Sequence, residues 1–127
     1  MKITTETIMS WKPCDTYDIN KVEELRKSAC GRRKNITIDD VLKTNIPDVD
    51  KLWLILRPEF IPEKELHQIA IFCWEKIAAP IWYKYYPNDK RPHEAVRIKK
   101  LWLDGKATDE ELAAAGAAAW DAARNAA

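Results

Sequence analysis

Residues 87–105, PNDKRPHEAVRIKKLWLDG, contain both a start signal and a stop signal for a helix. Pro87 and Asp89 favour a turn, and Pro92 suits the first turn of a helix, where the amide hydrogen that it lacks would have no partner. Gly105 supplies the left-handed residue that ends many helices. Helical patterns lie on both sides of this stretch. We therefore interpret it as the hinge of an all-α domain and as the best candidate contact surface.

Capping signals mark the helices expected in the first half of the chain. A threonine or aspartate before a helix accepts a hydrogen bond from a free amide of the first turn. Asp18 and Thr37 occupy such positions, and Asp40 is the reciprocal acidic partner of Thr37. We predict helices from Thr4 or Thr5 to about Trp11, from about 19 to 29, from Thr37 to about Lys43, and from Pro47 to before Pro58.

Two patterns indicate which helical residues are buried. The run LWLIL at residues 52–56 is apolar on all sides, so we expect its helix to be central and its Trp53 to be a core residue, together with Trp74. After Pro62, apolar residues recur at steps of three and four, which predicts one buried face that includes a buried free thiol. This stripe consists of Leu66, Ile69, Ala70, Cys73, Ile77 and Ile81. Pro80 removes a backbone donor within it, and we expect a kink or a break there.

An alanine-rich helix ends the chain. Thr108 and Glu111 form a capping box at its start, and it is expected to run from Asp109 to about Asn125. Alanine has the highest helix propensity, but this segment has few large apolar side chains to bury. We expect the helix either to pack closely on a neighbour or to fray. Its small residues also predict a homodimer through this helix, at Ala114, Gly116 and Ala118.

No segment shows the alternation of a half-buried strand beyond a few residues. The predicted fold is therefore all-α: a compact bundle of about six to seven short helices with the alanine-rich helix at its end. A chain of 127 residues fits one domain, which we place at residues 1–127.

Composition narrows the function. The net charge of +1 gives no global attraction to nucleic acid or to an acidic membrane. No apolar run is long enough for a membrane span, and the first residues lack the apolar core of a signal peptide, so we expect a cytoplasmic protein without membrane contact. Three cysteines and two histidines fit no usual zinc spacing, and we assign no metal and no cofactor.

The usual catalytic signatures are also missing. The sequence contains no glycine-rich phosphate loop, no H-E-x-x-H and no G-x-S-x-G. His67 with Glu63, four residues earlier, remains a hypothetical general base, but no nucleophile can be placed beside it. We therefore assign no catalytic residue and expect a protein that is not an enzyme.

The charged turn offers the most distinctive surface. Arg91 and Arg97 are suited to grip a carboxylate or phosphate, and neighbouring tyrosines are suited to stack on a planar group. The alternative is that Asp89 caps the helix while the arginines pair internally or stay solvated. The predicted contact residues are Trp82, Tyr85, Tyr86, Asp89, Arg91, Glu94, Arg97 and Lys100. The same region is locally basic, which also suits an anionic nucleotide or a short nucleic acid, through Lys84, Lys90, Arg91, Arg97, Lys99 and Lys100.

The tail from residue 87 to 127 resembles the Imm-5-like domain of putative immunity proteins. The hallmark is a D-x-R-P-x-E-A-[IV] turn, a short helix closed by glycine and an alanine-rich helix, matched by Asp89, Arg91, Pro92, Glu94, Ala95, Val96 and Gly105. We place the Imm-5-like portion at about 64–127. The segment IPDVDKLWLILRPEFIPEKELHQIAIFCWEKIA before it is similar to small proteins of bacteriophage genomes.

This resemblance implies a small, non-enzymatic interaction protein of phage type. Such a protein binds and neutralises another macromolecule, a host defence protein or a toxin-like protein, as an immunity or anti-defence factor and inhibitor. It would act in the host cytoplasm if a phage encodes it. The alternative is a binding module that sequesters an anionic nucleotide or short nucleic acid through the basic, tyrosine-rich turn.

Overall fold

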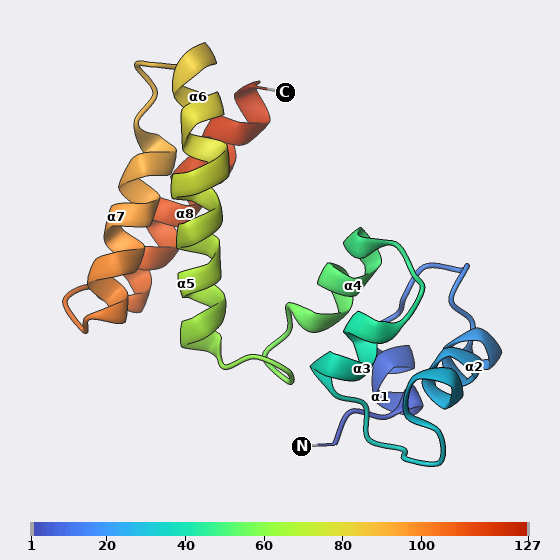
Figure 1. Cartoon of the computed structure of the whole chain (residues 1–127). Coiled ribbons are helices and arrows are strands. Elements are labelled where there is room, and N and C mark those ends of the chain that lie inside the picture. The colour runs from blue at the N-terminus through green and yellow to red at the C-terminus, as the bar shows by residue number, and fades with distance from the viewer. Residues whose placement is uncertain (1, 127) are drawn as a thin grey trace. The chain divides into compact units, whose positions relative to one another are not determined.

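The structure is a computed structural model that describes residues 2–126, and those residues form helices and no strand (Figure 1). The all-α prediction is confirmed. The chain divides into two compact units, Met1–Glu63 and Lys64–Ala127, which we call unit 1 and unit 2. A single domain over the whole chain stays a prediction.

Unit 1 contains four short helices in its described part. They are α1 (Thr5–Ser10), α2 (Ile19–Cys30), α3 (Ile38–Lys43) and α4 (Asp48–Ile55). The predicted caps are present: Asp18 accepts a hydrogen bond from the Lys21 amide at 2.8 Å, and Thr37 and Asp40 form a reciprocal capping box. Gly31 follows α2 with a φ of 62°, a conformation that favours glycine. The capping residues therefore set the helix boundaries as the sequence predicts.

The core of unit 1 is small and aliphatic. It consists of Ile3, Ile8, Val22, Ile36 and Val41. The Ile36 amide donates a hydrogen bond to the Ile3 carbonyl at 2.8 Å, which ties the segment before α1 to the segment before α3. The core therefore contains side chains from α1, α2 and α3 and from the segments that precede α1 and α3.

The prediction of a central, buried helix at LWLIL is wrong. None of the α4 residues is buried, and Trp53, expected in the core, is 41% exposed. The helix contacts the unit 1 core through Leu54 and Ile55. Because α4 packs through that one side, the apolar residues on its other side, such as Leu52, remain exposed.

Unit 2 begins within one long helical segment, of which only the first residue, Glu63, belongs to unit 1. The segment consists of α5 (Glu63–Cys73), a π-helical turn η1 (Trp74–Ala78) and α6 (Ala79–Tyr85). The chain stays helical through Pro80, which lies at the start of α6. A proline has no amide hydrogen and its ring clashes with the carbonyl four residues earlier, here that of Lys76. The irregularity expected at Pro80 is thus the wider π turn that directly precedes α6.

The remaining helices are α7 (Arg91–Leu103) and α8 (Asp109–Ala126), which lie side by side (Figure 1). Gly105 lies in the connection between α7 and α8, and its φ is 73°. The Lys106 amide donates to the Leu101 carbonyl at 2.8 Å, and the Gly105 amide donates to the Trp102 carbonyl at 3.0 Å, which is the Schellman pattern of a helix end. The predicted glycine stop is therefore present.

The alanine-rich helix α8 is ordered and packs on α7. The predicted capping box holds its start, where the Glu111 amide donates to Thr108 Oγ1 at 3.1 Å and the Thr108 amide donates to Glu111 Oε2 at 2.8 Å. Ala122 is buried, whereas Trp120 is 67% exposed. Of the two expectations for this helix, close packing on a neighbour is the one observed.

Candidate interaction surface

The turn between α6 and α7 is held by aromatic side chains. Trp82 Nε1 donates a hydrogen bond to the Asp89 carbonyl at 2.9 Å, and its ring lies 4.7 Å from the Tyr86 ring between centroids. The Tyr86 hydroxyl donates to the Ala126 carbonyl at 3.0 Å, which links the end of α6 to the end of α8. Trp82 and Tyr86, which were predicted as contact residues, therefore have a structural role in this turn.

Asp89 accepts a hydrogen bond from the first amide of α7 and pairs with Arg91, whereas the N-cap residue of the helix is Lys90. The Asp89 carboxylate accepts hydrogen bonds from the Arg91 amide at 3.2 Å and from two nitrogens of the Arg91 guanidinium, Nε at 2.9 Å and Nη2 at 2.7 Å. The hydrogen bonds from Arg91 lower the pKa of Asp89, and the same bonds raise the pKa of Arg91. Of the two interpretations offered for this cluster, internal pairing is the one that these contacts fit.

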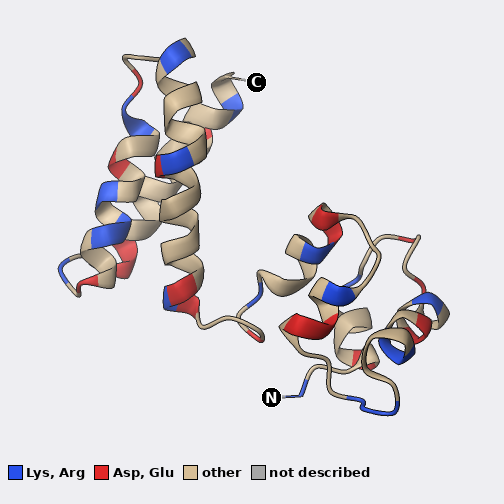
Figure 2. Cartoon of the chain, viewed as in Figure 1, with Lys and Arg blue, Asp and Glu red and all other residues tan. Residues whose placement is uncertain are grey.

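The other two cations of the predicted surface are paired as well. Arg97 Nε donates to Glu94 Oε2 at 2.9 Å within α7, which lowers the pKa of Glu94. Lys100 pairs with Glu75 and so joins α7 to η1. All of these side chains are exposed enough for water to screen them, so each pair adds little to stability. Figure 2 shows positive and negative residues interspersed along α7.

The lysines of the basic stripe have partners too. Lys84 Nζ lies 5.2 Å from the centroid of the Tyr85 ring, and Lys90 Nζ lies 4.5 Å from that of Tyr83. Partial burial lowers the pKa of Lys99. Lys84 and Lys90 therefore already contact tyrosine rings of the same region.

The inner face of the α5–η1–α6 helix is lined by aromatic rings. His67, the hypothetical general base, lies against Trp102 of α7 with ring centroids 4.8 Å apart. Trp74 and Tyr83 meet edge to face at 6.3 Å, and Tyr83 also lies 6.5 Å from His93. These contacts show which side of the long helix faces the rest of unit 2.

The opposite side of this helix exposes apolar residues that were expected in the core. Cys73 is exposed, and Ile77 and Ile81 are 60% and 59% exposed. With the exposed Tyr85 they form a row at steps of four residues, which we call the α5–α6 row. The prediction of a buried stripe is therefore wrong at Ala70, Cys73, Ile77 and Ile81, which are exposed, whereas Leu66 and Ile69 are half-buried.

The π turn keeps this row straight. Four residues of a regular α-helix turn through about 400°, so a row at steps of four drifts by about 40° a step. A π turn bonds each residue to the fifth one along, so it holds more residues per turn, and η1 lies in the middle of the row. It offsets part of the drift and leaves Cys73, Ile77, Ile81 and Tyr85 on one face.

Sequence periodicity found the row but assigned it to the core. The sequence does contain evidence against a buried row. The same helix carries a second set of large side chains on the opposite face, namely His67, Trp74 and Tyr83. A helix with two apolar faces can bury only one of them against a single layer of neighbours.

Within residues 2–126, no helix has the length and apolar character needed to cross a membrane. The same residues contain no group of three histidine, cysteine or acidic side chains placed to hold a metal ion.

A family model described as Imm-5 like putative immunity protein matches residues 60–127, which contain all of unit 2 and every residue of the α5–α6 row. The predicted contact residues of the turn fall in the same range. No curated protein and no solved structure matches this chain.

Proposed function

This chain belongs to the Imm-5 like putative immunity protein family, and we propose that it acts without catalysis, by binding another protein and neutralising it. The target is a host defence protein or a toxin-like protein, met in the cytoplasm of a bacterial host that carries a phage. Unit 2 supplies the binding surface in this proposal, because it carries the matched residues.

The observation that supports this function best is the exposed α5–α6 row. Large aliphatic side chains in a line on one helix face are unusual on a protein surface and are typical of contact sites for another protein. Ile77 and Ile81 form the middle of the row and Tyr85 ends it. A tyrosine at the end of such a row offers both an apolar ring and a polar hydroxyl to a partner.

The charged turn contributes the polar part of the proposed surface. Arg91 and Arg97 are exposed, and each is already oriented by a carboxylate, Asp89 or Glu94. A partner that meets these pairs encounters nearly neutral, ordered hydrogen-bonding groups. Such groups add specificity more than affinity.

Site-specific photo-crosslinking tests this function and identifies the target. A photoreactive phenylalanine analogue is placed at position 77, at position 81 or, as the control, at position 120 on α8, where the native Trp120 is equally exposed. We expect one and the same protein to crosslink from positions 77 and 81 and not from position 120. Equal crosslinking from position 120 would contradict a binding site at the row.

The activity of the crosslinked protein then separates inhibition from catalysis. We expect a titration with this chain to abolish that activity at a fixed molar ratio, because a binding inhibitor is consumed as it acts. Complete inactivation by a small fraction of an equivalent would identify an enzyme instead.

The nucleotide-binding alternative has less support. A phosphate at Arg91, Arg97 or Lys100 would have to compete with Asp89, Glu94 or Glu75, which already pair with these cations. Displacing a carboxylate gives up a charge-assisted hydrogen bond for each one that the ligand gains.

The homodimer through α8 stays a proposal. Ala114 and Gly116 are exposed on α8, and Ala118 is half-buried. A Cβ atom added at Gly116 would meet no atom within 4 Å, so the backbone there is open to a neighbouring helix. A second copy is the neighbour that we propose for this face.

A further inference from the structure

Unit 1 contains a partly open cavity that lies outside the matched residues 60–127. Its volume is about 240 Å³, and it lies between α2 and α4 with the segment before α2 at one side. Its wall is mostly apolar, with Leu25 and Ala29 from α2, Ile46 before α4, and Val49 and Trp53 from α4. We call it the α2–α4 pocket.

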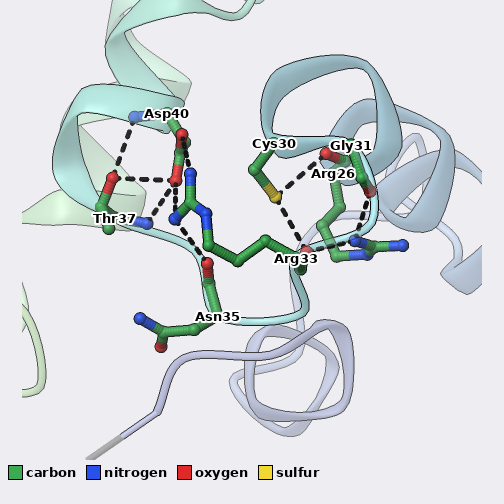
Figure 3. Close-up of polar contacts among 7 residues, drawn as sticks. All are labelled: Arg26, Cys30, Gly31, Arg33, Asn35, Thr37 and Asp40. Atoms are coloured by element: carbon green, nitrogen blue, oxygen red, sulfur yellow. Dashed lines mark hydrogen bonds and ion pairs between the residues drawn. The ribbon is translucent and has the colours of Figure 1, made fainter.

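Polar side chains in the wall already have hydrogen-bond partners within unit 1. Arg26 donates to Glu23 at 2.7 and 3.0 Å and to the Gly31 carbonyl at 3.1 Å, and it also contacts the Arg33 carbonyl. The Cys30 thiol contacts the carbonyls of Arg26 and Arg33 (Figure 3). The Arg26 guanidinium and the Cys30 thiol, which lie on the α2 side of the wall, are therefore already hydrogen-bonded.

The other polar groups are paired in the same way. Asp40 accepts two hydrogen bonds from Arg33, at 2.8 and 2.9 Å, and further bonds from the hydroxyl and the amide of Thr37, as Figure 3 shows. The Tyr17 hydroxyl donates to Asp50 at 2.6 Å, and the Thr44 hydroxyl donates to the Val41 carbonyl at 2.5 Å. A polar ligand in the pocket would lose its hydrogen bonds to water and gain none in exchange, which costs free energy.

We propose that the α2–α4 pocket binds a small, uncharged, apolar molecule. A dry cavity of about 150 Å³ lined by aliphatic and aromatic side chains is large enough for benzene. The larger volume here suits a molecule of up to about two fused aromatic rings. The pocket is concave and walled by several separate segments of unit 1, as sites for small molecules are.

Naphthalene is the probe, and the charged analogue 2-naphthoate is the control ligand. Titration of the full chain, observed through the side-chain methyl signals in NMR spectra, should give saturable shifts at Leu25, Ile46 and Val49 with naphthalene. The same concentration of 2-naphthoate should give none, because its carboxylate would be left without a partner. Equal binding of both compounds, or no saturable shift with naphthalene up to its solubility limit, would overturn the proposal.

A matched pair of variants locates the binding. Ala29→Phe places a ring in the pocket and should weaken naphthalene binding at least tenfold, whereas Ser28→Phe, on the exposed side of α2, should leave it unchanged. Circular dichroism establishes that both variants are folded. Unchanged affinity in a folded Ala29→Phe variant would place naphthalene elsewhere and overturn the proposal.

The thiols supply a readout that does not depend on the variants. Cys14 and Cys30 line the pocket, whereas Cys73 lies in unit 2. Saturating naphthalene should slow the reaction of Cys30 with a thiol reagent several-fold and leave the rate at Cys73 unchanged.

If naphthalene does not bind but Ala29→Phe abolishes capture of the crosslinked target protein, the pocket receives an apolar side chain of that protein, and the small-molecule proposal is wrong.

Discussion

At the scale of single residues, the strongest polar interactions lie in unit 1. Asp40 is buried, and the hydrogen bonds from Arg33, followed by those from Thr37, hold its pKa well below its usual range. Arg26 and then Thr5 lower the pKa of Glu23 to about 2. The link between Thr37 and Asp40 could be predicted from their spacing. The contribution of Arg33 could not, because a loop residue seven positions away has no periodic relation to its partner.

These carboxylates predict an acid-sensitive unit 1. Because their pKa values are lower in the folded protein than in the unfolded chain, their contribution to stability is present above the unfolded pKa, about 4. It is lost as the pH falls through the lower folded values. Asp40→Asn should therefore lower the free energy of unfolding by about 1–3 kcal/mol at pH 7. It should also reduce the further loss of stability between pH 5 and pH 2.

Urea unfolding across this pH range checks the Asp40 prediction. Asp39→Asn is the matched control, because Asp39 is the adjacent, exposed carboxylate in the same helical turn. It should change stability by only a few tenths of a kcal/mol, through its interaction with the helix dipole. An equal loss in the two variants would show that the Arg33 and Thr37 contacts of Asp40 contribute nothing specific.

At the scale of helices, boundaries were easier to predict than burial. Caps at Asp18, Thr37 and Thr108 and the stop at Gly105 are local chemistry, so the sequence contains them directly. Which side of a helix is buried depends on its neighbours. The helix at LWLIL and the α5–η1–α6 helix are both apolar on more than one side. The first was wrongly predicted to be buried all round, and part of the predicted buried face of the second is exposed.

Replacement by alanine should have opposite effects at the two glycines of unit 2, Gly105 and Gly116. Gly116 lies within α8 with open space around its missing Cβ, so in a single copy of the chain Gly116→Ala should stabilise the fold by about 0.5–1 kcal/mol through helix propensity. Gly105 has a φ of 73°, so Gly105→Ala should destabilise it by about 1 kcal/mol or more. Thermal unfolding measures both. Destabilisation by Gly116→Ala would indicate that α8 needs the bare backbone for a close contact.

At the scale of the whole molecule, the family match and the division of the chain nearly coincide. The matched range starts at residue 60, and unit 2 starts at Lys64. The expected Imm-5-like portion, about 64–127, could be placed from the turn motif and the alanine-rich helix. The α5–α6 row could not be recognised as a surface from the sequence, because its exposure depends on which face of the helix packs against α7.

The proposed binding through the α5–α6 row is tested most directly by the affinity for the crosslinked target protein. Ile77→Ser with Ile81→Ser removes the two large aliphatic side chains at exposed positions, so the fold should tolerate the change. Each buried side chain contributes about 1.5 kcal/mol or more, so calorimetry should show about 100-fold weaker binding by the double variant. Trp120→Ser, the exposed control on α8, should bind within about twofold of the native chain. Native affinity in the double variant would contradict the account.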